Sequence, residues 1–194
     1  LGTITAKLTT KGHNIDEWLA ALNGHAAFDV ENGAVNGINL TKAISEDYVK
    51  YITKITTEEK AKNQTVFQQF SGTATLANGV AHTEDLTLKS PQLSVLGKGD
   101  TNLVNKTLDM RLNVKVEGEL AKQLKELRGI NIPVTAQGQF VKPKIKTDLD
   151  KVIKDIAKAK VKAETQQAVQ QQREELKKKA EQQLQNKLKG LFNR

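Results

Sequence analysis

The chain has 194 residues, of which 38% are hydrophobic and 4% aromatic, so it can form one domain with a thin core, or one domain with an appendage. No run of 18 apolar residues is present, which excludes a membrane-spanning helix within this sequence, and the absence of cysteine excludes disulfides and thiolate chemistry. The net charge is +8, and residues 150–194 carry +6 of it.

This basic tail can meet an anionic membrane surface or nucleic acid, although a solvated helix with both signs interspersed is the more ordinary interpretation. The sequence begins at Leu1 without a basic segment followed by an apolar one, so we expect no signal peptide. A start without methionine suggests a processed product or part of a longer chain.

The first 24 residues predict a strand and a short helix. Residues 1–10 alternate weakly in polarity, as a strand does. Asn14 can cap a helix that ends at Asn23-Gly24, with Gly24 as a left-handed cap. Trp18 falls on the apolar stripe of this helix, where we expect it to join the core.

Asn-Gly pairs at residues 32–33 and 78–79 lie between apolar runs and predict two hairpins of one design. We prefer three-residue loops with a left-handed glycine, because that register places the apolar residues of each hairpin on one face. In the second hairpin this register pairs Leu76 with Val80, and His82 falls on the apolar face as a satisfied core histidine. Two such hairpins suggest a repeated unit, although two copies are weak evidence for a repeat.

Between the hairpins, residues 41–55 predict a helix and residues 56–65 a polar loop or frayed helix end. The apolar stripe of the helix is Leu40, Ile44, Tyr48, Tyr51 or Ile52, and Ile55.

Residues 73–116 predict a meander of long antiparallel strands with one apolar face. Pro91 interrupts it, and a four-residue loop at 104–107 would pair Leu103 with Leu108. In that register Gly97 and Gly99 stand opposite large apolar residues. Two interpretations are about equally favoured, a simple bend or bulge and a smooth channel floor.

The last part of the chain predicts two helices with a strand between them. Residues 119–128 form a short helix closed by Gly129, and residues 130–141 form a strand. A long helix then follows Asp148, with two amphipathic stretches joined by a Gln-rich, weakly packed middle.

No catalytic constellation is found in the sequence. His13, His25 and His82 each lack a second metal ligand at helical or strand spacing, so we expect no metal site. Carboxylates such as Asp100 and Asp109 fall on solvent faces. We therefore expect no enzyme activity and no cofactor, and the basic patches lack the interleaved aromatic residues of single-strand nucleic-acid binders.

The order and spacing of several motifs resemble the C-terminal region of the AsmA family of bacterial envelope proteins. These motifs are Leu22-Asn-Gly24, residues 29–40 (DVENGAVNGINL), 72–80 (GTATLANGV), 90–99 (SPQLSVLGKG) and 127–150 (LRGINIPVTAQGQFVKPKIKTDLD). The resemblance implies an inner-membrane protein with one N-terminal membrane helix and a large periplasmic part, similar to bridge-like lipid-transfer proteins. It also implies roles in phospholipid movement to the outer membrane and in outer-membrane assembly. Under this resemblance, the 194 residues correspond to the far end of such a bridge, and we expect the anchor and the long upstream β-region of such relatives to be outside them.

We therefore predict an α+β fold with a curved, groove-like antiparallel β-sheet over residues 1–149, short helices, and a basic helical tail over residues 150–194. The expected function is non-enzymatic phospholipid binding or transfer, with the tail near a membrane surface or envelope proteins and without nucleic acid. The alternative is a protein-interaction module that acts through strand edges and the C-terminal helix. The predicted groove residues are Leu76, Val80, Leu86, Leu88, Leu93, Val95, Leu103, Leu108, Met110, Leu112, Val114 and Val116.

Overall fold

The computed structural model describes residues 1–53 and 63–192. These residues fall into two compact units, Leu1–Asp150 and Lys151–Arg194, and we call the first the sheet unit. The second unit consists of helix α4 (Leu149–Phe192), whose first residues belong to the sheet unit. The helix continues through the Gln-rich middle without a break, and the side chains of residues 157–179 are exposed.

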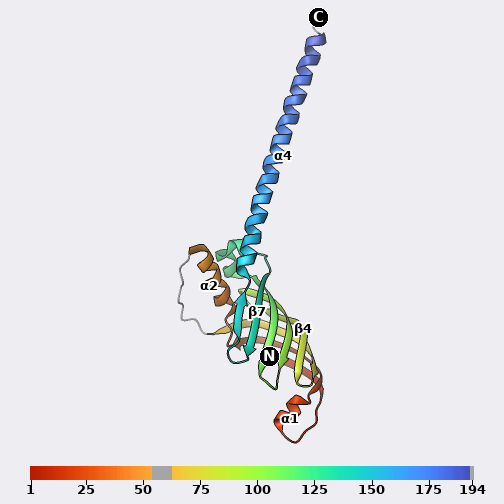
Figure 1. Ribbon diagram of the computed structural model, residues 1–194, viewed down its shortest axis with the longest axis vertical. Coiled ribbons are helices and arrows are strands. Elements are labelled where there is room, and N and C mark those ends of the chain that lie inside the picture. Colours follow the sequence, from red (N-terminus) through yellow and green to blue (C-terminus); the bar gives the residue numbers. More distant parts are fainter. Residues whose placement is uncertain (54–62, 193–194) are drawn as a thin grey trace. The chain divides into compact units, whose positions relative to one another are not determined.

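The sheet unit contains a single open antiparallel sheet whose eight strands follow one another in chain order (Figure 1). This confirms the predicted α+β class. The strands are β1 (Gly2–Thr9), β2 (Asn23–Asn36), β3 (Gln64–Ala77), β4 (Val80–Lys89), β5 (Leu93–Asn102), β6 (Thr107–Val116), β7 (Ile132–Gln139) and β8 (Lys144–Thr147). The other helices that the structure describes are α1 (Ile15–Ala20), α2 (Leu40–Thr53), α3 (Gly118–Gln123) and the 3-10 turn η1 (Lys125–Leu127).

The sheet curves around α2, which contacts both β3 and β8 although these strands lie far apart in the strand order. Hydrogen bonds fix both contacts. Thr65 Oγ1 on β3 accepts from Leu40 N at 3.1 Å, and Thr147 Oγ1 on β8 donates to Asp47 Oδ2 at 2.5 Å. We call the concave side of the sheet, which faces α2, the inner face.

Helix α2 confirms the predicted stripe as far as its side chains are described. Leu40, Ile44 and Tyr48 are 4%, 0% and 6% exposed. The predicted position Ile55 and most of the predicted 56–65 loop lie outside the described residues, and Thr65 already belongs to β3.

Helix α1 begins as predicted, because Asn14 Oδ1 accepts a hydrogen bond from Glu17 N at 2.9 Å. Two expectations about it were wrong. Gly24 is a residue of β2, paired with Leu8 and Leu76, and does not cap the helix. Trp18 is 47% exposed, and its indole N–H donates to the Gly12 carbonyl, because α1 lies at the opposite end of the sheet from α2 (Figure 1) and buries no residue.

The first predicted hairpin, at residues 32–33, does not form. Strand β2 runs straight through Asn32, which has a φ of +54°, and pairs with β3 on both sides of it. Gly33 allows the ring of Phe67 to pack closely against the backbone of β2, since a Cβ there would lie 2.6 Å from that ring. The repeated-hairpin interpretation was therefore wrong.

The second hairpin forms, but with a two-residue loop. Asn78 and Gly79 have φ values of +49° and +77°, as the type I′ turn requires, and Ala77 pairs with Val80. The shorter loop moves His82 to the outer face of the sheet, so the prediction of a core histidine was wrong.

Helix α3 and turn η1 replace the single predicted helix at 119–128, and they bury its predicted apolar side, Leu120, Leu124 and Leu127. These residues and α2 cover one end of the inner face, which we call the covered end. The largest fully buried side chains of the sheet unit are Ile44, Leu93, Leu127, Ile132, Val114, Val116 and Val134.

Candidate functional site

The remaining part of the inner face is hollow. A cavity of about 380 Å³ lies there, within the range of small-molecule sites. Its lining carries no charged group, and its only polar side chains are four threonines. The lining residues are Phe28, Val35, Ile38, Leu40, Thr65, Phe70, Thr73, Ala74, Ala81, Thr83, Leu86, Leu88, Val95, Thr101, Leu108, Met110 and Leu112.

The strand register places these side chains together. Ala81, Thr101 and Leu108 stand in one row across β4, β5 and β6, and Leu76 on β3 extends the same row. In antiparallel strands, directly paired residues share a face of the sheet. Hence apolar residues from strands distant in sequence line one surface.

A β-bulge on β4 keeps this strand in phase with the cavity. The pairing shifts by one residue between Thr83 and Leu86, so that both of these residues line the cavity. Asp85 holds the bulge, because its carboxylate accepts from Thr73 N at 2.8 Å and from Thr73 Oγ1 at 2.9 Å. These hydrogen bonds lower the pKa of Asp85, the backbone N–H of Thr73 having the largest effect.

The two glycines of β5 do not form an empty floor. Gly97 pairs with Leu112, and a Cβ on it would lie 2.7 Å from Leu112 Cδ2 and 3.1 Å from Leu86 Cδ2. Gly99 has a φ of +144°, and a Cβ there would lie 2.1 Å from the Asp109 carbonyl oxygen. The glycines therefore allow neighbouring groups to approach closely, and the channel-floor interpretation was wrong.

The predicted groove residues separate into four groups. Leu86, Leu88, Val95, Leu108, Met110 and Leu112 line the cavity, and Leu76 lies on the same face. Leu93, Val114 and Val116 are at most 2% exposed and belong to the covered end. Val80 pairs with Ala77 and Asn102 on the outer face, and Leu103 lies in the turn after β5, where its N–H donates to the Gly79 carbonyl.

The sequence prediction missed the cavity residues of β2 and of the segment before α2. Phe28 and Phe70 contact each other with ring centroids 5.0 Å apart, and Val35 also lines the cavity. The false turn at residues 32–33 separated β2 from the meander. The alternation of apolar residues on β2 was the signal for Phe28. Alternation alone would have placed Val35, seven residues further along, on the other face.

The covered end closes the inner face beyond the cavity. The hydroxyl of Tyr48 on α2 donates to Glu126 Oε2 on η1. Burial, reinforced by this hydrogen bond and by the nearby carboxylate, raises the pKa of Tyr48 to about 12. The neutral phenol therefore ties two covering elements together at all physiological pH values.

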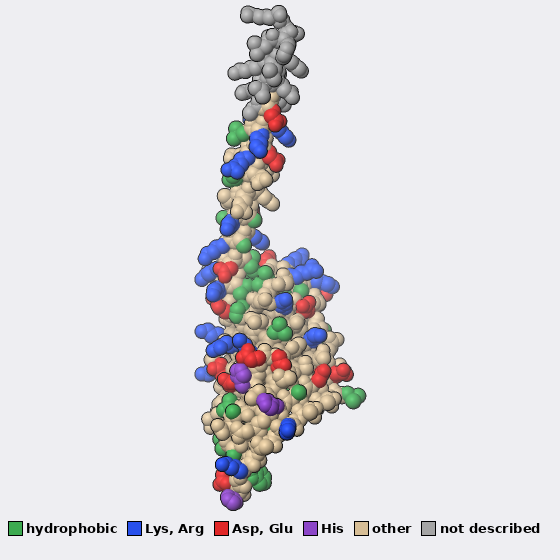
Figure 2. Space-filling model, turned by 90° about the vertical axis from the view of Figure 1, so that its right-hand side faces the viewer, with side chains coloured by type: hydrophobic (Ala, Val, Ile, Leu, Met, Phe, Trp, Pro, Cys, Tyr) green, Lys and Arg blue, Asp and Glu red, His purple; other side chains and the backbone are tan. Residues whose placement is uncertain are grey.

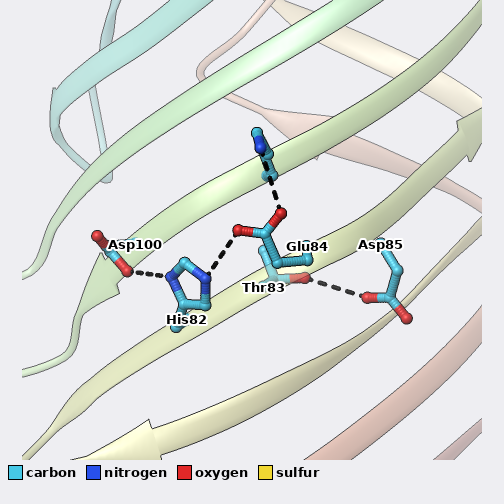
Figure 3. A network of polar contacts seen from close by, with 6 residues as sticks. His82, Thr83, Glu84, Asp85 and Asp100 are labelled. Carbon is cyan, nitrogen blue, oxygen red and sulfur yellow. Dashed lines mark hydrogen bonds and ion pairs between the residues drawn. The ribbon is translucent and has the colours of Figure 1, made fainter.

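The outer face is polar and carries a histidine network (Figures 2 and 3). His82 Nδ1 lies 2.6 Å from Asp100 Oδ1, and His82 Nε2 lies 3.0 Å from Glu84 Oε1. Lys98 Nζ donates to the other oxygen of Glu84 at 3.3 Å. The hydrogen bonds to Asp100 and then Glu84 raise the pKa of His82, because both ring nitrogens face carboxylates and only the protonated ring donates to both.

The described residues group no metal-ligating side chains on either face. Asp100 and Asp109 pair on the outer face, and both are exposed, as predicted. In residues 1–53 and 63–192 no three His, Asp or Glu side chains are grouped so as to hold a metal ion. Within the same residues, no helix combines the length and apolar character of a membrane span.

Comparisons with known proteins give a family match. Residues 1–86 match the model of the AsmA family. Protein AsmA of Escherichia coli (strain K12) is 22% identical over 134 residues, which cover 68% of this chain and 22% of that relative. The chain thus spans about a fifth of the relative's length. No solved structure gives a significant match.

Proposed function

We propose that this chain is an envelope protein of the AsmA family, whose model its residues 1–86 match. We further propose that its sheet unit is a non-enzymatic module that binds an acyl chain of a phospholipid. The observation that carries this proposal is the cavity of about 380 Å³, which has an apolar lining without a charged side chain. An acyl chain needs no hydrogen bonds and gains about 0.8 kcal/mol for each buried CH₂. The four threonines cost little, because a hydroxyl can bond to neighbouring backbone groups.

We further propose a role for this module within a longer, membrane-anchored protein. The module would act in the periplasm, as part of an inner-membrane-anchored protein that moves phospholipid toward the outer membrane and supports its assembly. Helix α4 carries most of the net charge and would lie near anionic headgroups or envelope proteins.

Native mass spectrometry of the purified chain tests the proposal directly. We expect bound phospholipid, and we expect Ala81→Phe to abolish it because the ring fills the cavity. Ala77→Phe is the matched control, since Ala77 precedes the same turn but lies on the outer face. A lipid-free wild-type chain, after expression in a Gram-negative host, or equal lipid in both variants would contradict acyl-chain binding in the cavity.

One observation favours protein interaction as a second function. Strand β1 pairs with β2 along one edge, and among the described strands nothing pairs with its other edge. Ile4 and Leu8 on this strand are 75% and 44% exposed. An unpaired edge with apolar side chains can accept a partner's strand.

Crosslinking in cells separates the two functions. Thr3→Lys together with Thr5→Lys should weaken crosslinks between β1 and an envelope protein, because charged side chains on an edge strand oppose strand addition. The bound lipid should be unchanged, because Thr3 and Thr5 pair with Asp29 and Ala27 on the outer face. Undiminished crosslinks would exclude β1 as the interaction edge.

A further inference from the structure

A second hollow lies directly beside the cavity. It is a cleft of about 610 Å³ between the start of α2, the start of β3 and the turn that joins β4 to β5. Its lining differs in chemistry from that of the cavity, because it contains hydroxyls, amides and both signs of charge. Its polar members include Thr41, Lys42, Ser45, Gln64, Ser90 and Gln92.

The cleft and the cavity are bordered by the same segments of chain. Before and within α2, Ile38 and Leu40 line the cavity, whereas Asn39 and Thr41 line the cleft. Thr65 lines both hollows. On the other side, β4 and β5 contribute apolar residues to the cavity and the turn between them contributes polar residues to the cleft. The cavity lining therefore has no charged side chain, whereas the cleft lining adds Lys42 and Glu46 to its apolar members Val49, Val66 and Pro91.

The backbone leaves this boundary without a continuous wall. Strand β3 pairs with β4 only from Gln69 onward, and residues 64–67 pair with β2 alone. No strand ladder therefore joins the start of β3 to the turn at Ser90–Gln92 in the part of the chain that the structure describes.

We propose that the cleft binds the phosphate-bearing headgroup of the phospholipid whose acyl chain occupies the cavity, an inference that rests on the proposed function. The Lys42 ammonium is the cation of the site. It lies 3.6 Å from Glu46 Oε1. About one third of each side chain is exposed, and such a pair within one helix is weak enough for a phosphate oxygen to share the ammonium. The hydroxyls of Thr41 and Ser45 lie on the same part of α2 and supply neutral donors.

The bound phospholipid then has a defined orientation. The polar end lies at the start of α2, and the apolar chain runs along the inner face toward Ala81, Thr101 and Leu108. It cannot continue into the covered end, where Leu93 and Val114 have no exposed surface.

The test compares two lipids with identical acyl chains, phosphatidylethanolamine and diacylglycerol, in binding to the 194-residue chain. We expect Lys42→Gln to weaken phosphatidylethanolamine binding about tenfold and to leave diacylglycerol binding unchanged. Lys42→Arg should restore binding to within about twofold. Lys50→Gln is the control, because Lys50 is on the same helix but does not line the cleft.

The outcomes distinguish the headgroup site from the acyl-chain site. If the wild-type chain binds both lipids equally well, or if Lys42→Gln and Lys50→Gln behave alike, the headgroup site is wrong and the acyl-chain site stands. If neither lipid binds, the proposed function fails and the headgroup site fails with it. Thermal unfolding of each variant shows that a loss of binding is not a loss of fold.

Discussion

The two halves of strand β6 present the same alternating pattern and have different environments. Leu108, Met110 and Leu112 line the cavity, whereas Val114 and Val116 are sealed beneath helices. The strand does not cause the difference, because its register with β5 is regular from end to end. The difference comes from α2, α3 and η1, which cover one end of the inner face only. An apolar strand face thus becomes core or binding surface according to what covers it.

The largest expected effect compares one leucine from each half. Leu93→Ala removes a side chain with no exposed surface and should lower the free energy of unfolding by about 3 kcal/mol. Leu108→Ala removes a half-buried side chain that borders the cavity and should cost about 1 kcal/mol. Urea denaturation measures both changes. Equal costs would mean that the two halves are packed alike and that the cavity is an extension of the core.

Alternation with period two predicted the strands well. An error in strand pairing leaves the faces correct when the shift is an even number of residues. The turn after β5 was placed one residue too late, which shifts the pairing with β6 by two residues. A shift of two returns every side chain to its own face, so Leu108, Met110 and Leu112 stayed on the inner face. The turn after β3 was one residue too long, and a slip of one residue moved Val80 and His82 to the wrong face.

The covering helices and the bulge could not be predicted in the same way. The sequence locates α2 and the helix at 119–128, but nothing local says which half of a long strand they cover. The β-bulge adds one residue within β4, near Asp85, rather than in the turn before it. A carboxylate that accepts a backbone N–H from a neighbouring strand leaves no periodic signal. Asn32-Gly33 has the composition of a turn, and the pairing of β2 with β3 before and after Asn32 keeps the strand extended there.

A second prediction concerns the closure of the covered end. Tyr48→Phe removes the hydrogen bond between α2 and η1 and should cost about 1 kcal/mol at neutral pH. Because the folded-state pKa is raised from 10.0 to about 12, the neutral phenol stabilises the wild-type fold below pH 10, and this stability is lost between pH 10 and 12. Denaturation at pH 7, 10 and 12 should show a smaller alkaline loss in the variant. Equal losses of stability in the wild type and the variant at alkaline pH would mean that ionisation of Tyr48 does not affect the stability of the covered end.

A third prediction concerns the bulge of β4, where we expect a loss of stability similar to that of Tyr48→Phe. Asp85→Ala removes both acceptors of Thr73 and should cost about 1 kcal/mol. The pKa of Asp85 is lowered from 3.8, so its contribution is present above that value and is lost as the pH falls through the folded-state pKa. Acid unfolding should therefore depend less on pH in the variant, and an unchanged acid profile would contradict this role.

The smallest effect is expected on the outer face, where neither helix nor ligand is involved. The pKa of His82 is raised from 6.5 and that of Glu84 is lowered from 4.5, so their network contributes most between these two pH values. The His82 part is lost as the pH rises through its folded-state pKa. NMR titration should show that Asp100→Asn lowers the pKa of His82, and lipid binding should be unchanged. A change in lipid binding would mean that the outer-face network affects the cavity, which contradicts this prediction.

The central claim is that one half of the inner face binds an acyl chain and the other half is core, and crosslinking within β6 tests it most directly. A phospholipid with a photoreactive group on its acyl chain is bound to the chain and irradiated, and the modified residues are identified by mass spectrometry. The account predicts modification at Leu108, Met110 and Leu112 and none at Val114 or Val116. Equal modification along the whole strand, or modification at outward residues such as Arg111, would contradict it.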